Sequence, residues 1–176
     1  VVRVAPGIPE FYPVTPKTIS VFWDVSASSS SRNIKAEFNY LEQYILENNI
    51  KKASITLFNH AIQQKWVIET KPGNLKALRN YLLEYNYSGA TMFGNLDLSV
   101  VNSDVILIFS DGFNTIGKAL PKSALVQVIC IVSADYNDIG LLNKIISATG
   151  GSMVYLNKAS MKVAFKKTEL AQNFLM

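Results

Sequence analysis

The run of residues 105–109, Val-Ile-Leu-Ile-Phe, constrains the fold of this chain most strongly. It is apolar throughout, whereas a strand with one exposed face alternates apolar and polar side chains. Residues 125–132 form a second such run, in which Gln127 is the only polar residue. Two such runs predict strands that are buried on both faces, and therefore a sheet covered by helices on each side. With 176 residues, the chain is long enough to bury such a core.

Extended and helical patterns alternate along the rest of the sequence. The β-branched and aromatic residues of 18–23 favour a strand. Apolar residues then recur at spacings of four, three and four, which favours an amphipathic helix. These residues are Ile34, Phe38, Leu41 and Ile45. Strands are predicted at 18–23, 52–58, 64–69, 105–109, 125–132 and 153–156. Helices are predicted from the serine cluster to about residue 48, from Asn74 as N-cap through Tyr85, near 96–101, over 139–148, and after Thr168.

The predicted fold class is α/β, a Rossmann-like doubly wound, mostly parallel sheet with helices on both faces. Residues 52–58 and 64–69 are joined by a short polar connection, so we expect a hairpin that supplies one antiparallel edge strand. Residues 1–16 contain four prolines, which exclude a continuous helix and predict an extended lead-in or interdomain linker. We expect residues 17–176 to form a single domain and interpret the chain as a piece of something longer.

Composition excludes several classes of function. The net charge of +4 comes from scattered lysines rather than a basic cluster, so we expect no nucleic-acid partner. The longest uninterrupted apolar run is far too short to span a bilayer. Zinc is disfavoured because the chain has one cysteine and one histidine. Cys130 lies inside an apolar run and is interpreted as a buried thiol, and His60 is interpreted as a surface residue of the hairpin.

Hard oxygen donors follow two of the predicted strands. Asp24, Ser26 and Ser28 come at alternate positions where the first strand ends, and Asp111 follows the run 105–109. In an open α/β sheet, turns at the carboxyl ends of the strands meet where the winding direction reverses. A loop with Gly89-Ala90-Thr91 would add a third hydroxyl, with Gly89 and Gly112 letting the backbone bend closely. This donor set suits Mg²⁺ or Mn²⁺, with Ca²⁺ as a further option. The predicted metal site is Asp24, Ser26, Ser28, Thr91 and Asp111.

These three elements, in this order, resemble the metal-ion-dependent adhesion site of the von Willebrand factor type A (vWA) domain, and the resemblance covers about residues 17–174. It implies that Ser26, Ser28 and Thr91 are direct ligands and that Asp24 and Asp111 act mostly through bound waters. It also implies a non-enzymatic, metal-dependent protein-binding module of adhesion type, in which the ion bridges to an acidic residue of a protein partner. An extracytoplasmic or cell-surface setting is favoured by the same resemblance.

The sequence departs from the family pattern near this site. Ala27 stands where glycine is frequent, and we expect its methyl group to be tolerated unless the position needs a positive φ. The turn after the run 105–109 carries Ser110 where threonine is common. Met92 and Phe93 follow the loop threonine in place of a polar residue. Together with Phe113, these two residues either form an apolar collar around the site or lie beneath the loops.

Two other functions stay open. The first is a scaffold or assembly domain of the same fold, part of a larger multidomain protein, with an empty or merely structural metal site. The second, less favoured, is a Mg²⁺-dependent phosphohydrolase with a strand-end aspartate as nucleophile. Against that alternative, the first turn has no second aspartate two residues on, and the sequence has no glycine-rich phosphate loop.

Overall fold

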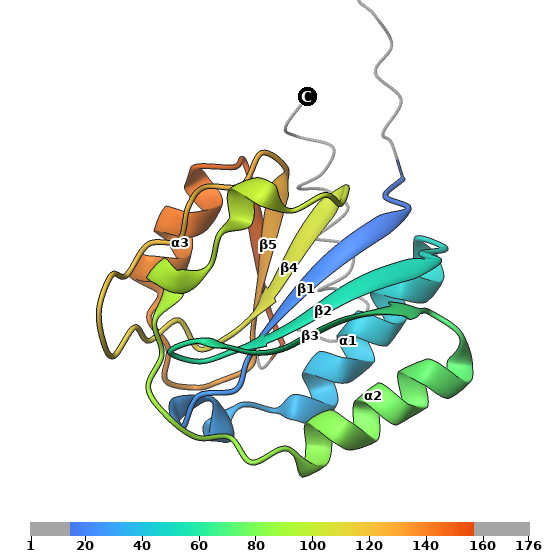
Figure 1. The fold of residues 1–176 in the computed structure, drawn as a ribbon, viewed down its shortest axis with the longest axis horizontal. Helices are drawn as coiled ribbons and strands as arrows, with labels where there is room; N and C mark the ends of the chain where they lie inside the picture. The colour runs from blue at the N-terminus through green and yellow to red at the C-terminus, as the bar shows by residue number, and fades with distance from the viewer. Residues whose placement is uncertain (1–14, 157–176) are drawn as a thin grey trace, which may run out of the picture.

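The computed structural model describes residues 15–156, and its centre is a six-stranded twisted sheet (Figure 1). The strands are β1 (Thr18–Asp24), β2 (Lys52–Phe58), β3 (Ile62–Glu69), β4 (Val105–Phe109), β5 (Gln127–Val132) and β6 (Ser152–Tyr155). Their order in the sheet is β3-β2-β1-β4-β5-β6. Every neighbouring pair is parallel except β2 and β3, which form an antiparallel hairpin. The predicted α/β fold with one antiparallel edge strand is confirmed.

Helices cover both faces of the sheet, as predicted for strands that are apolar throughout. Helices α1 (Ile34–Glu47) and α2 (Pro72–Glu84) pack on one face. Helix α3 (Ile139–Ser147) packs on the other face, together with the 3₁₀ turns η2 (Phe93–Asn95) and η3 (Leu98–Val100). Within residues 15–156, none of the helices combines the length and the apolar character needed to cross a membrane.

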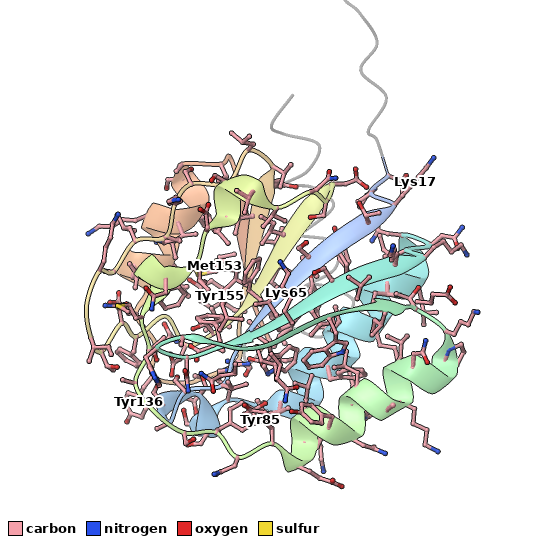
Figure 2. All side chains as sticks on the ribbon, in the orientation of Figure 1. Lys17, Lys65, Tyr85, Tyr136, Met153 and Tyr155 are labelled. Atoms are coloured by element: carbon pink, nitrogen blue, oxygen red, sulfur yellow. The ribbon has the colours of Figure 1, made fainter. Side chains whose placement is uncertain are left out.

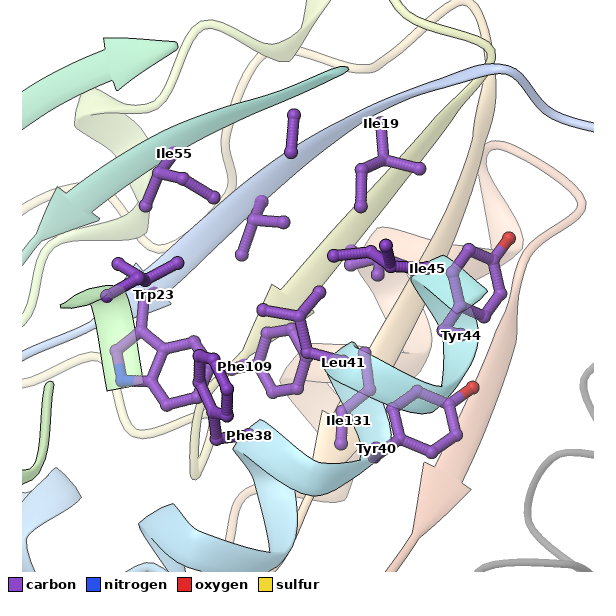
Figure 3. Close-up of a cluster of buried hydrophobic side chains, with 14 of the residues drawn as sticks. Ile19, Trp23, Phe38, Tyr40, Leu41, Tyr44, Ile45, Ile55, Phe109 and Ile131 are labelled. Carbon is purple, nitrogen blue, oxygen red and sulfur yellow. The ribbon is translucent and has the colours of Figure 1, made fainter. Parts of the chain in front are cut away.

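The core beneath α1 is built around stacked aromatic rings (Figure 3). Trp23 of β1 and Phe109 of β4 lie in neighbouring strands, and their ring centroids are 4.5 Å apart. Phe38 and Leu41 of α1 are fully buried in the same cluster. This packing fixes the last residues of β1 and β4 side by side, at the edge where the candidate site lies.

The winding direction of the chain reverses between β1 and β4. From β1 the chain proceeds to β2 and β3 on one side, and then returns to continue with β4, β5 and β6 on the other. The carboxyl ends of β1 and β4 are therefore adjacent at a topological switch point, the usual location of ligands in open α/β sheets.

Two helix starts differ from the prediction. The serine cluster does not begin α1 directly, because the 3₁₀ turn η1 (Ser28–Ser31) precedes it and Arg32 is extended. The N-cap of α1 is Asn33, whose side chain accepts a hydrogen bond from the amide of Ala36 at 3.1 Å. The prediction of Asn74 as a cap was wrong, because Pro72 occupies the first turn and α2 begins there.

Three strands also begin at different residues, and β6 begins at Ser152, one residue earlier than predicted. Strand β3 starts at Ile62, earlier than predicted. Strand β5 starts at Gln127, and Leu125 is 88% exposed rather than part of the sheet. An apolar run alone could not show where sheet pairing begins. Most of the lead-in 1–16, the segment 158–167 and the helix after Thr168 lie outside the described residues.

The thiol of Cys130 should be unreactive in the folded protein. Cys130 is fully buried in β5, and burial raises its pKa to about 12. Because the thiolate is the reactive form, we expect iodoacetamide to leave the native protein unmodified at pH 8 and to alkylate it fully in urea. Mass spectrometry would measure both, and rapid alkylation without denaturant would contradict this burial.

Candidate metal centre

The first turn of the site is organised by the carboxylate of Asp24, which ends β1 and is fully buried. Its Oδ1 accepts a hydrogen bond from the amide of Ser26 at 2.9 Å. Its Oδ2 accepts the hydroxyl proton of Ser110 at 2.6 Å, across from β1 to the turn after β4. Asp24 therefore shapes its own turn and joins that turn to the neighbouring strand. Ser110, which the sequence marked only as a replacement for threonine, makes this link.

The two serines of the motif place their hydroxyls together. Ser26 Oγ and Ser28 Oγ are 3.2 Å apart, and Ser26 Oγ also donates to Ser29 Oγ at 3.3 Å. Ala27 between them has φ −61°, in the right-handed region, so alanine is as suitable as glycine here. The expectation that its methyl group is tolerated is confirmed.

Asp111 lies beside this turn and is only 1% exposed. Its Oδ1 accepts a hydrogen bond from the amide of Phe113 at 3.1 Å, whereas Oδ2 is buried without any hydrogen-bond partner. Burial raises the pKa of the Asp111 carboxyl and the nearby charge of Asp24 raises it further, while the adjacent Ser28 hydroxyl lowers it. Four of the five predicted residues, Asp24, Ser26, Ser28 and Asp111, thus meet at the ends of β1 and β4.

Thr91 reaches the site through its loop. The amide of Ala27 donates to the carbonyl of Gly89 at 3.0 Å, which joins the loop to the first turn. Thr91 and Thr115 exchange two hydrogen bonds, Thr91 N to Thr115 Oγ1 at 2.8 Å and Thr115 N to Thr91 O at 3.0 Å. The hydroxyl of Thr91 is buried and has no hydrogen-bond partner. The loop therefore contacts both turns, but the Thr91 side chain makes no hydrogen bond with the other four predicted residues.

The glycines next to the site have the backbone conformations that the sequence suggested. Gly89 and Gly112 both have φ +82°, where a side chain would be strained. A Cβ on Gly112 would also lie 2.6 Å from the carbonyl oxygen of Asp138, at the start of α3. Gly112 thus lets the turn that carries Asp111 pack directly against α3.

Asn59, in the tip of the hairpin, is a residue that the sequence reasoning missed. Its side-chain amide donates to the carbonyl of Ser88 at 3.0 Å, and its backbone carbonyl accepts from the amide of Met92 at 3.2 Å. Asn59 is buried, while the adjacent His60 is exposed as predicted. The hairpin therefore holds the loop of Thr91 at both ends. Nothing in the sequence distinguished Asn59 from an ordinary turn residue.

A buried ion pair lies directly beneath the first turn. The guanidinium of Arg32 contacts the carboxylate of Glu37 at 2.7 Å, and both side chains are fully inaccessible to solvent. Arg32 Nη1 donates to the carbonyl of Asp24 at 2.8 Å, to the carbonyl of Phe109 at 3.0 Å and to Ser29 Oγ at 3.1 Å. One guanidinium thus connects the carboxyl ends of β1 and β4 to the serine turn.

Glu37 extends this network to β5. Its Oε1 accepts the hydroxyl proton of Ser133, the residue after β5, at 2.7 Å, and Ser133 Oγ accepts the amide of Asn33 at 2.8 Å. Burial raises the pKa of the Glu37 carboxyl, while Arg32 and Ser133 lower it. The sequence did carry a signal for Glu37, because it lies on the apolar face of α1, three residues after Ile34.

The sequence left open whether three apolar residues near the site form an exposed collar or lie beneath the loops, and the answer is not the same for all three. Phe93 lies beneath the loops, fully buried against Phe58 with ring centroids 5.5 Å apart. Phe113 is 37% exposed, and Met92 is half-buried. Tyr136 is a further exposed residue, at 84%, in the loop after β5 (Figure 2). Figure 2 shows it at the end of the molecule opposite Lys17, which precedes β1.

The donor atoms fit a hard divalent cation. Three hydroxyls and two carboxylates are the oxygen ligands that Mg²⁺ and Mn²⁺ prefer. Among residues 15–156, no three or more His, Cys, Asp or Glu side chains gather in a way that could hold a metal, so a site here depends on the hydroxyls. The unpartnered oxygens of Thr91 and Asp111 are the two donors not already used within the protein.

Comparison with known proteins shows the fold. No protein-family model and no curated protein sequence matches the chain. Among solved structures, it is similar to a von Willebrand factor type A protein from Catenulispora acidiphila, with 10% identity, a TM-score of 0.57, and 89% of this chain and 42% of that chain covered. BatB from Bacteroides thetaiotaomicron matches with 11% identity, a TM-score of 0.57, and 86% and 95% covered. The SpRpn10 VWA domain matches with 10% identity, a TM-score of 0.52, and 89% and 97% covered. The chain has a vWA-like fold.

Removing Arg32 should destabilise the protein in a pH-dependent way. In Arg32→Met the buried Glu37 loses the charge that compensates it, which costs about 3–5 kcal/mol of unfolding free energy at neutral pH. The folded-state pKa of Glu37 then rises further above its unfolded value. The folded state therefore binds the proton more tightly, and the deficit shrinks as the pH falls through the raised pKa. Urea unfolding between pH 5 and pH 8 measures this, and a deficit independent of pH would contradict it.

Replacing Thr91 by valine should stabilise the protein, whereas removing Arg32 should destabilise it. The Thr91 hydroxyl is buried without a partner, so Thr91→Val removes an unsatisfied polar group at nearly constant shape. We expect the variant to be about 1 kcal/mol more stable than wild type when both are unfolded by urea in EDTA. The backbone contacts with Thr115 do not involve this hydroxyl and should persist. A loss of stability would indicate that the hydroxyl has a partner within the protein.

Proposed function

We propose that this domain binds a divalent cation at the carboxyl edge of its sheet and uses the ion to bind a protein partner. The ion would be Mg²⁺ or Mn²⁺, or Ca²⁺, which takes the same oxygen donors. The residues that would hold it are Asp24, Ser26, Ser28, Thr91 and Asp111. The observation that carries the proposal is the pair of unpartnered buried oxygens, Thr91 Oγ1 and Asp111 Oδ2. Buried polar atoms are nearly always satisfied. Among residues 15–156, three buried side-chain oxygens have no partner, and two of them belong to the predicted site, while the third, Ser152 Oγ, lies in β6. The coincidence of two in one site supports a ligand there.

The chemistry of the donors favours a bridging role for the ion. Ser26, Ser28 and Thr91 are neutral, and direct ligation by them leaves most of the positive charge of the ion uncompensated. Asp24 and Asp111 would act mostly through waters, orienting the direct ligands as outer-shell carboxylates do. A carboxylate from another molecule can then bind the ion strongly. The expected partner is therefore a protein with an exposed acidic side chain, and the domain itself would not be an enzyme.

The surroundings of the site support a protein partner rather than a small anion. Phe113 directly follows the turn of Asp111 and is partly exposed. Tyr136 lies in a loop that contacts the site at one end, through the amide of Asp138 to the carbonyl of Asp111 at 2.9 Å, and the N-cap of α1 at the other, through Ser133 to Asn33. Exposed aromatic rings beside a polar centre are typical of protein interfaces. The acidic residue of the partner would thus lie next to apolar contact surface.

One observation favours the scaffold alternative. Both carboxylate oxygens of Asp24 already accept hydrogen bonds, from the Ser26 amide and the Ser110 hydroxyl. The first turn is therefore well ordered by contacts within the protein. Partner binding through the exposed aromatic residues Phe113 and Tyr136 could then proceed without an ion. Undiminished partner binding in EDTA would favour this alternative. The same contacts weigh against a phosphohydrolase, because a nucleophilic Asp24 would need an oxygen facing its substrate.

Calorimetry with Mn²⁺ tests the metal site directly. We expect the wild-type domain to bind one ion, and Asp24→Ala and Ser26→Ala to lose most of the heat of binding. Ser31→Ala is the matched control, because the Ser31 hydroxyl is exposed and donates only to the carbonyl of Ser28. Equal heats for wild type, Asp24→Ala and Ser26→Ala would end the proposal.

A further inference from the structure

The buried ion pair also bears on how the proposed metal ligands are oriented. Ser29 is the third serine after Asp24, and it belongs neither to the alternating motif nor to the cap of α1. It is fully buried, and its hydroxyl oxygen contacts Ser26 Oγ on one side and Arg32 Nη1 on the other. A buried serine hydroxyl between a fixed cation and a predicted metal ligand requires a physical explanation.

The direction of the hydrogen bonds gives that explanation. A guanidinium has donors only, so Arg32 must donate to Ser29 Oγ, and the serine oxygen is the acceptor in that contact. Ser29 Oγ has a second lone pair, and it accepts the hydroxyl proton of Ser26. The proton of Ser26 therefore points toward Ser29.

The contact between Ser26 and Ser28 explains why the Ser26 hydroxyl proton needs another acceptor. Their hydroxyls are 3.2 Å apart, and either one can donate to the other in the metal-free protein. If both oxygens bind the same ion, each must direct lone pairs at it, and neither can use the other as acceptor. Ser28 has the carboxylate of Asp111 beside it as an alternative acceptor. For Ser26, the alternative acceptor is Ser29.

We propose that Ser29 and Arg32 are positioning residues of the metal site, in which Arg32 fixes Ser29 as acceptor of the Ser26 proton and so leaves the Ser26 oxygen free to ligate the ion. This inference rests on the proposed metal site and adds two residues to it. Arg32 itself is held in place by Glu37 and by the carbonyls of Asp24 and Phe109. Glu37 also neutralises its charge, so the guanidinium can lie beneath a cation site without strong repulsion.

Ser29→Ala isolates this role from the stability of the fold. Removing the hydroxyl leaves Arg32 Nη1 with two carbonyl acceptors, so the ion pair stays satisfied. We expect the dissociation constant for Mn²⁺ to rise about tenfold, as it does when outer-shell partners of metal ligands are lost. Titration of the free-Mn²⁺ signal in electron paramagnetic resonance measures this directly. Ser29→Cys keeps nearly the same volume with a poorer acceptor and should weaken binding as well. Ser31→Ala, on the same turn, should leave the dissociation constant unchanged.

Urea unfolding in EDTA, carried out on each variant, separates the possible outcomes. If Ser29→Ala lowers the unfolding free energy but leaves the Mn²⁺ dissociation constant at the wild-type value, Ser29 is only structural and the inference is overturned. If wild type itself gives a flat Mn²⁺ titration, the proposed metal site fails and the positioning role fails with it. A wild type that binds and a Ser29→Ala variant that binds equally well would reject the positioning role alone.

Discussion

The buried pair of Arg32 and Glu37 is the interaction on which the ligand-bearing edge of the sheet depends. Parallel strands end in carbonyl groups and turns that no neighbouring strand satisfies, and β1, β4 and β5 end side by side here. Arg32 satisfies the carbonyls of Asp24 and Phe109, and Glu37 satisfies the hydroxyl of Ser133. Taking two charges out of water is expensive, but here nearly every donor and acceptor of the pair has a partner. The three strand ends are thereby fixed relative to one another.

Around this pair, the groups that shape the turns have hydrogen-bond partners, whereas two oxygens of the predicted site have none. Asp24 is saturated by contacts with Ser26 and Ser110, and the backbone of the Thr91 loop is held by Thr115 and Asn59. The Thr91 hydroxyl and one oxygen of Asp111 are the exceptions. Exceptions of this kind are expected at functional sites, where local stability is given up for binding. Under the proposed function, rigid turns with two free donors would form a preorganised receptor.

The fold and the positions of the turns could be predicted because each has a local signal. The uninterrupted apolar run of β4 indicated a parallel strand, and the alternation of Asp24, Ser26 and Ser28 marked the first turn. The supporting residues could not be predicted in the same way. No sequence pattern marks Arg32, because its role depends on a hydrogen bond to the carbonyl of Phe109, which is 77 residues away in sequence. Ser29 belongs to the serine cluster from which a helix was predicted to run, and only the extended backbone at Arg32 shows that the helix begins later.

The donor set of the candidate site contains only oxygen atoms, and this has a consequence for the environments in which the domain can work. Neither sulfur nor imidazole takes part, and the single thiol, Cys130, is enclosed in the interior of β5. None of the five side chains is therefore a thiol or thioether that peroxide or thiol–disulfide exchange can alter. The predicted donors stay chemically the same under reducing and oxidising conditions.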